Sequence, residues 1–326
     1  MKPTETSLDG MMDIDRLAQM LDFHSVVSNT EALADWLMAQ LRPHATRIEQ
    51  DRLGAIYAWR GESPQVGFFC HLDSVGFMVE EIHEAHVQVV PLGKPATPHY
   101  TPIVIQSDTG MVNGTLLVQG ADDERTLRVD LWDEAVAAQL QVGDLAAFAP
   151  NFRQEAGRIH SRWLDNKLGI WVALEAWLAS DEALFVAMVR EEQAPHDAGA
   201  VALRLPDLAL ALVVDITYAA SPEGPYMVAQ GNGPSLTLRD AMVYDRRWLS
   251  AIRRVAERHQ IPLQPEITLV GGSDATMLSM FGLPALFIGI PTRYAHSPAE
   301  MAHLSDCEAA VTLLTATATA FQTGVI

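Results

Sequence analysis

Four apolar segments of the chain each have acidic or histidine side chains at or just beyond their carboxyl ends, and this pattern constrains the fold more than any other feature. The segments and the side chains that follow them are residues 65–70 with His71 and Asp73, residues 184–189 with Glu191 and Glu192, residues 208–214 with Asp215, and residues 285–290 with His296. Ligands bind beyond the carboxyl ends of the strands in open α/β sheets. The sequence therefore predicts an α/β fold with a polar site at one edge of the sheet.

Each of these side chains also has an ordinary structural interpretation. A fifth carboxylate, Asp165, opens a predicted helix and by itself would suit an N-cap. His296 could equally be a hydrogen-bonded loop histidine. His71 and Asp73 fit either a polar strand end or a ligating histidine whose second ring nitrogen is held by a carboxylate. Asp215 is more diagnostic, because an unpaired carboxylate beside a core is costly. The recurrence of the pattern is what favours a functional site.

Together the side chains offer two histidines, two aspartates and one glutamate as metal ligands, and they leave a second glutamate free to act as a base. This set is too large for a single tetrahedral zinc ion. It suits two ions that share a bridging carboxylate. The pattern therefore predicts a metal-assisted hydrolase.

The composition excludes several classes of partner. The 326 residues carry 22 Lys and Arg against 41 Asp and Glu, a formal net charge of −19. Neither a basic stripe nor a basic tail is present, so we expect no binding to nucleic acid or to an anionic membrane. Two cysteines are too few for a disulfide framework. The amino terminus is polar, and no run approaches the roughly 18 apolar residues of a membrane span. We therefore expect a cytoplasmic protein.

The order of the predicted elements indicates two domains. Helices and apolar strands over residues 1–75 and 151–326 form one α/β domain, and short alternating strands over residues 76–150 form an inserted β-rich domain. Helices are predicted over residues 13–22, 28–41, 166–179, 246–259 and 305–322, and a further helix begins at Ser273. In the second of these helices, Ser28 and Glu31 would form a capping box. Strands are predicted within residues 45–59 and over residues 144–150 and 266–270.

Seven motifs in register resemble metallopeptidase family 42, the glutamyl and TET-type aminopeptidases. The motifs are HLDSVGFMV, LDNKLG, a strand followed by Glu-Glu, VVDIT, GNGPSL, GGSDA and IPTRYAHS, over roughly residues 66 to 300. The resemblance implies a mixed sheet sandwiched between helix layers and an aminopeptidase that acts on peptides. It also implies two divalent ions in each subunit, Zn²⁺ or Co²⁺.

The resemblance also implies a role for each residue of the site. It assigns Asp165 as the bridging ligand, His71 and Asp215 to one ion, Glu192 and His296 to the other, Glu191 as the general base, and Asp73 as the partner of His71. Arg293 is a candidate for holding a substrate carboxylate or carbonyl, although an arginine paired with a neighbouring acid is as plausible. Ser273 replaces the family's usual threonine and keeps the hydroxyl, and the segment after the paired glutamates is longer than usual.

The resemblance further implies that the inserted domain forms dimers, which can assemble into a dodecamer. Exposed strand edges in that domain would independently favour a partner. Two alternative functions share part of this pattern. A glycoside hydrolase also uses paired carboxylates, but it has no role for histidine ligands. A metal-binding scaffold without catalysis would be expected to lose Glu191, which is present.

Overall fold

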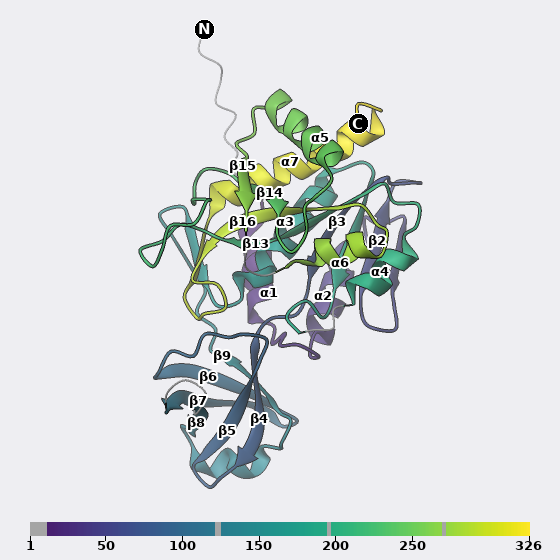
Figure 1. Ribbon diagram of the computed structural model, residues 1–326. Helices are drawn as coiled ribbons and strands as arrows, with labels where there is room; N and C mark the ends of the chain where they lie inside the picture. Colours follow the sequence, from purple (N-terminus) through teal and green to yellow (C-terminus); the bar gives the residue numbers. More distant parts are fainter. Residues whose placement is uncertain (1–11, 121–124, 194–196, 269–271) are drawn as a thin grey trace.

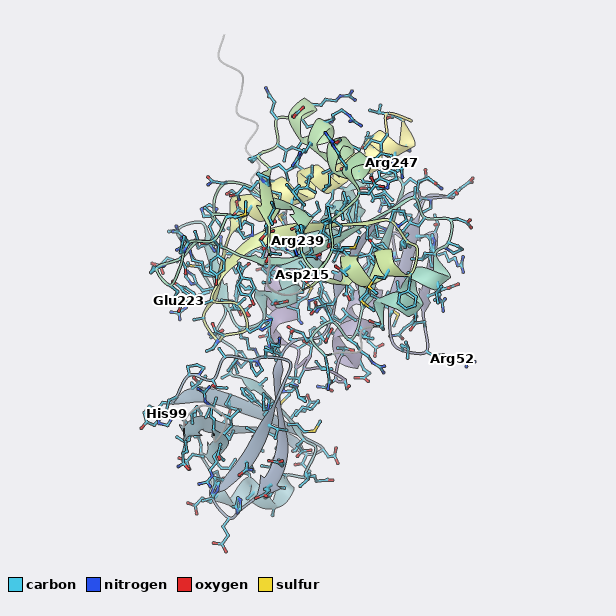
Figure 2. All side chains as sticks on the ribbon, viewed as in Figure 1. Arg52, His99, Asp215, Glu223, Arg239 and Arg247 are labelled. Atoms are coloured by element: carbon cyan, nitrogen blue, oxygen red, sulfur yellow. The ribbon has the colours of Figure 1, made fainter. Side chains whose placement is uncertain are left out.

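The computed structural model describes residues 12–120, 125–193, 197–268 and 272–326. These residues form a large α/β unit and a small closed β-barrel that lies at one end of it (Figure 1). In Figure 2, Asp215 lies in the middle of the α/β unit, and His99 marks the barrel. None of the helices among the described residues has the length and apolarity needed to cross a bilayer.

The centre of the α/β unit is an 11-stranded sheet in which the strands that precede the predicted site residues are neighbours. These four strands are β12 (Ala183–Met188), β3 (Val66–His71), β13 (Leu210–Tyr218) and β16 (Ala285–Arg293). They run parallel to one another, in that order. They are buried almost throughout, as expected for parallel strands covered on both faces. Their carboxyl ends therefore meet at one edge, as the sequence predicts.

The remaining strands extend this sheet on both sides. They are β1 (Arg47–Gln50), β2 (Ile56–Arg60), β10 (Arg153–Glu155), β11 (Arg158–Ser161), β14 (Ser235–Arg239), β15 (Gln264–Ile267) and β17 (Glu300–His303). Antiparallel pairing of β2 with β12 and of β17 with both β16 and β11 makes the sheet mixed.

Helices cover the sheet, which confirms the predicted helix/sheet/helix arrangement. They are α1 (Ile14–Asp22), α2 (Glu31–Leu41), α3 (Leu164–Ala179), α4 (Ala198–Arg204), α5 (Arg246–Arg258), α6 (Asp274–Met280) and α7 (Leu304–Gln322). The helix α3 is buried over nearly its whole length and packs against β3, β13 and α7. Its tryptophans, Trp171 and Trp177, belong to the core.

The barrel lies within the interval predicted as an inserted domain. Its strands are β4 (Gly76–Ile82), β5 (His86–Leu92), β6 (Thr101–Ser107), β7 (Gly110–Gln119), β8 (Thr126–Leu131) and β9 (Leu145–Phe148), and a 3₁₀ helix, η2, covers Glu134–Gln139. They close in the order β4-β5-β8-β7-β6-β9 around a separate apolar core that includes Phe77 and Phe148. Closure pairs both outer strands, so the expectation of exposed strand edges in this segment is wrong.

Several predicted boundaries are also wrong. The helix α2 begins after Thr30, and no side chain caps it, because Ser28 lies outside the helix with a φ of 69°. The strand β12 ends at Met188, so the two adjacent glutamates lie in the loop beyond it. The strand β13 continues through Asp215 to Tyr218, where it still pairs with its parallel neighbour β16. Residues 269–271, which include the end of a predicted strand, and residues 194–196, in the longer segment after the glutamates, lie outside the described residues.

Candidate metal centre

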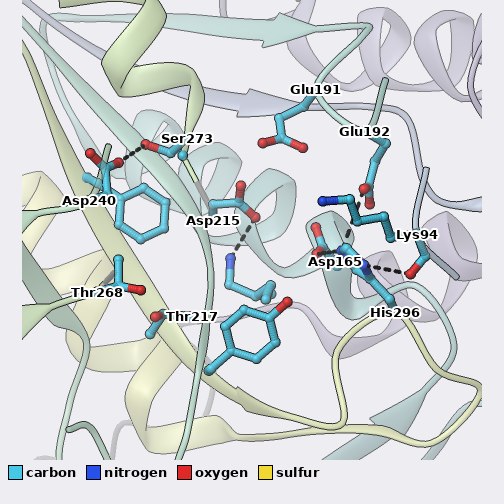
Figure 3. A pocket seen from close by; sticks show the side chains of 14 residues that line it. Lys94, Asp165, Glu191, Glu192, Asp215, Thr217, Asp240, Thr268, Ser273 and His296 are labelled. Carbon is cyan, nitrogen blue, oxygen red and sulfur yellow. Dashed lines mark hydrogen bonds and ion pairs between the residues drawn. The ribbon is translucent and has the colours of Figure 1, made fainter. Parts of the chain in front are cut away.

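Five of the predicted site residues line a pocket of about 440 Å³ at the carboxyl edge of the parallel strands. Figure 3 shows Asp165, Asp215 and His296 facing this pocket from separate segments, with Glu191 and Glu192 facing it from one loop. His71 lies beneath them at the end of β3 and is 1% exposed. Side chains far apart in the sequence thus meet because the strands that precede them are neighbours in the sheet.

One set of side chains consists of His71, Asp165 and Asp215. Nε2 of His71 lies 3.2 Å from Oδ1 of Asp165 and 3.4 Å from Oδ2 of Asp215. The three potential ligand atoms lie within 4.8 Å of one another. A divalent ion with ligand distances near 2 Å needs donor atoms at about this separation.

A second set consists of Asp165, Glu192 and His296. Nε2 of His296 lies 3.2 Å from Oδ2 of Asp165 and 3.5 Å from Oε2 of Glu192. These ligand atoms again lie within 4.8 Å of one another. Asp165 is the member common to both sets and turns one carboxylate oxygen toward each histidine. A carboxylate placed in this way suits the bridging position between two ions.

The start of α3 places Asp165 between the two sets. A Cβ atom at Gly169 would lie 2.3 Å from the carbonyl oxygen of Val214, so only glycine lets the helix approach β13 so closely. Asn166 reinforces this contact, because its side chain donates to the Val214 carbonyl and accepts from the Gly169 amide, both at 2.9 Å. Asp165 is therefore held beside Asp215, the residue that follows Val214 on the strand.

Asp73 connects His71 to the loop of the two glutamates. It is fully buried, and its carboxylate accepts hydrogen bonds from the backbone amides of Glu191, at 3.2 Å, and Glu192, at 3.0 Å. Its Oδ1 also lies 3.4 Å from Nδ1 of His71. Burial would raise the pKa of Asp73, but His71 and these amides outweigh burial and hold the pKa below its usual value. Nδ1 of His71 lies closer to the backbone carbonyl oxygen of Asp73, at 3.1 Å, than to the carboxylate that was expected to hold it, and Asp73 lies just beyond the end of β3 rather than on it.

His296 is held by the segment that leaves the barrel after β5. Its Nδ1 lies 3.1 Å from the carbonyl oxygen of Lys94, and its own carbonyl accepts from the amide of Ala96 at 2.8 Å. An Nδ1–H that donates to a carbonyl leaves Nε2 free to bind a metal. The barrel therefore contributes to the orientation of one candidate ligand.

Burial makes the charges of the site costly. Burial and the charge of Asp165 raise the pKa of Glu192 well above its usual range. Burial likewise raises the pKa of Asp215 to about 6. Three buried ligand atoms, Nε2 of His71, Oδ1 of Asp165 and Oε1 of Glu192, make no hydrogen bond to the described residues. Divalent cations would neutralise the carboxylates and satisfy these atoms, so the residues present fit a metal centre.

The structure separates the positions of the two glutamates. Glu192 belongs to the second set, whereas Glu191 lines the pocket but belongs to neither set. Burial raises the pKa of Glu191 well above its usual value, and the nearby carboxylates Asp274 and Asp215 add to this. Arg293 is not among the described residues that line the pocket, and its Nε donates to the carbonyl of Ala220 at 2.7 Å.

Sequence reasoning did not assign several residues of this region. Lys94 and Tyr218 line the pocket, as does Asp240, which accepts hydrogen bonds from Tyr244 and Ser273. Glu300, on β17, contacts the backbone of the site. None of these four directly follows a long apolar run. Of the four, Lys94 alone lies in the interval assigned to the inserted domain, where no site residue was expected.

Comparisons with known proteins relate the chain to aminopeptidases. A family model described as M42 glutamyl aminopeptidase matches residues 54–313. The lysyl aminopeptidase of Pyrococcus furiosus is 27% identical over 311 residues, which cover 86% of this chain and 89% of that protein.

Solved structures share the fold. The aminopeptidase APDkam598 from the archaeon Desulfurococcus kamchatkensis has a TM-score of 0.87 at 23% identity and covers 93% of both chains. The TET1 peptidase of Pyrococcus horikoshii, which can assemble into a tetrahedron or a large octahedral shell, has a TM-score of 0.82 at 21% identity, with 94% of this chain and 98% of that chain covered. A Thermotoga maritima structure named as an endoglucanase has a TM-score of 0.76 at 22% identity, with 94% and 96% covered. Because the family model spans most of its length, the chain belongs to the M42 glutamyl aminopeptidase family.

Proposed function

We propose that the chain is a metal-dependent aminopeptidase with two divalent ions, Zn²⁺ or Co²⁺, in each subunit. His71 and Asp215 would hold one ion, Glu192 and His296 the other, and Asp165 would bridge them. The observation that carries this proposal is the placement of Asp165, whose two carboxylate oxygens lie 3.2 Å from the Nε2 atoms of the two histidines.

The chemistry follows from the ions and from Glu191. Two bound divalent ions would supply Lewis acidity at the scissile carbonyl and lower the pKa of a water molecule toward neutrality. Glu191 accepts the proton of that water and returns it to the leaving amine. Asp73 keeps the loop in place by accepting from the Glu191 and Glu192 amides.

The glycosidase alternative has less support. A pair of carboxylates that cleaves a sugar must flank the glycosidic bond. Here Glu192 faces Asp165 and His296, so it is not a free partner for Glu191. The name endoglucanase belongs to a structure that shares the fold at 22% identity, whereas the family matched is one of aminopeptidases.

The proposed function predicts that cleavage requires a free amino terminus. With Zn²⁺, Co²⁺ or Mn²⁺ supplied, we expect hydrolysis of some members of a panel of L-aminoacyl-p-nitroanilides. The N-acetylated forms of the same substrates should not be cleaved, because exopeptidase action depends on the free amine of the substrate reaching the two metal ions and the carboxylates of the pocket. Carboxymethyl cellulose serves as the glycosidase control. Equal cleavage of free and acetylated substrates, or release of reducing sugar, would reject this assignment.

We also propose that the chain forms at least a homodimer through the barrel, and that dimers can assemble further, as the Pyrococcus horikoshii peptidase does into its tetrahedron or octahedral shell. The barrel exposes large apolar side chains, including Met111 at 56% and Trp132 at 63%. Light scattering should give at least twice the 35.7 kDa of one chain. Met111→Lys should weaken association, whereas Val243→Lys, at a 69% exposed position outside the barrel, should not. A monomer at micromolar concentration would contradict the proposal.

A further inference from the structure

Glu300 is a buried carboxylate that joins two of the candidate ligands through their backbones. It is 1% exposed. Its Oε2 accepts a hydrogen bond from the amide of Asp165 at 3.0 Å, and its Oε1 accepts one from the amide of His296 at 2.7 Å. Asp165 lies 135 positions away in the sequence, so the contact is not a local turn.

The sheet explains why one side chain reaches both segments. The strand β17 pairs with β11, where Ser161 lies opposite Glu300, and it pairs with β16, where Arg293 lies opposite Met301. Asp165 follows β11 after a few residues, and His296 follows β16. Glu300 therefore stands at the start of the strand that separates the chain segments leading to the two ligands.

We propose that Glu300 is a positioning residue that sets the spacing between Asp165 and His296, and thereby the affinity of the ion that these residues would share with Glu192. This inference rests on the proposed function. Hydrogen bonds from amides to a carboxylate are shorter and stronger than neutral ones, so a buried carboxylate can fix two backbone segments. The other ion's remaining ligands, His71 and Asp215, belong to β3 and β13, and no hydrogen bond links them to Glu300 among the described residues.

A second buried carboxylate has a comparable arrangement beside the two glutamates. Asp73 accepts from the amides of Glu191 and Glu192, so Glu192 keeps its anchor when Glu300 is changed. Loss of Glu300 should then release the Asp165 and His296 backbones alone. This separation predicts that one of the two ions is affected much more than the other.

The test is metal binding by Glu300→Gln, measured by competitive titration with a chromophoric chelator and Zn²⁺, and by the visible absorption of the Co²⁺-substituted protein. Glutamine keeps the shape but brings an NH₂ group against a backbone N–H, so one of the two hydrogen bonds is lost. We expect one ion to bind about 10–100-fold more weakly, the range for loss of a group that orients a ligand. The other ion shares only Asp165 with the released segments and keeps His71 and Asp215, so its affinity should fall much less. Glu300→Asp keeps the charge on a shorter side chain, so its affinity for the weakened ion should lie between those of the wild type and Glu300→Gln. It replaces the glutamine variant if that variant fails to fold.

Asp306→Asn is the matched control. Asp306 is fully buried and accepts from the amides of Gly231 and Gly233, both at 2.8 Å, but it belongs to neither ligand set. It should lose a comparable amount of thermal stability while both ions bind normally. The inference is overturned if the wild type binds two ions and Glu300→Gln does too with unchanged affinities, or if Asp306→Asn weakens the same ion equally. A wild-type protein that binds fewer than two ions overturns the proposed function itself.

Discussion

Glu191→Gln should lower kcat by about 10²–10⁴-fold, the usual contribution of a general base, while both metal ions stay bound. Glutamine has nearly the same shape as glutamate but cannot accept a proton from water at neutral pH. Glu191 lines the pocket and belongs to neither set of candidate ligands, so its replacement removes no ligand atom. The proton transfer is lost while the ions and the pocket remain. Steady-state kinetics and metal analysis by mass spectrometry on the same preparation measure both quantities.

Glu192→Gln is the matched control, because it makes the same chemical change one residue away. Glu192 faces Asp165 and His296, and its Oε2 lies 3.5 Å from Nε2 of His296. An amide is a poorer ligand than a carboxylate, so this variant should lose one ion together with its activity. If Glu191→Gln lost an ion while Glu192→Gln kept both, the two roles would be reversed.

Removal of the divalent ions should abolish hydrolysis, and their return should restore it. Without them, no group among the described residues of the pocket replaces the Lewis acid that polarises the carbonyl and acidifies water. The folded protein should also become less stable, because ions that bind only the folded state stabilise it by about 2.7 kcal/mol for each site held at about 100 times its dissociation constant. Dialysis against a chelator, followed by activity assays and thermal unfolding with and without Zn²⁺ or Co²⁺, tests both effects.

The control for this experiment is parallel dialysis without chelator, with the metal content of every sample determined. Mg²⁺ added back alone should restore little activity, because two of the ligands are histidines and Mg²⁺ prefers oxygen donors. Full activity in protein shown to be free of metal would rule out the metal-dependent mechanism.

The part of the site that follows buried strands could be predicted from the sequence. An apolar run such as residues 208–214 identifies a core strand, and the carboxylate that directly follows it, Asp215, lies in the carboxyl-terminal part of that strand. Parallel neighbours then bring those strand ends together. The fold class followed from the same runs, together with the family resemblance.

The supporting residues could not be predicted in this way, because their role depends on contacts between distant segments. Glu300 opens a strand of only four residues, Glu300–His303, and nothing in its neighbourhood identifies the amide of Asp165 as its partner. Lys94 acts on His296 through its backbone carbonyl, which every residue possesses. The closure of the barrel was missed for the same reason, since alternating strands do not reveal whether the first and last of them pair.

The attachment of His296 to the segment after β5 has a thermodynamic consequence. Lys94 and Ala96 hold both the ring and the carbonyl of His296, and both belong to the segment that follows β5 in the barrel. Linked equilibria are reciprocal. If the barrel binds a second copy of the chain, as proposed, and this binding shifts the segment, it would change the dissociation constant of the proposed neighbouring ion, and filling that ion site would change the affinity of the barrel contact by the same factor. Self-association measured across a series of free Zn²⁺ concentrations would give that coupling free energy directly.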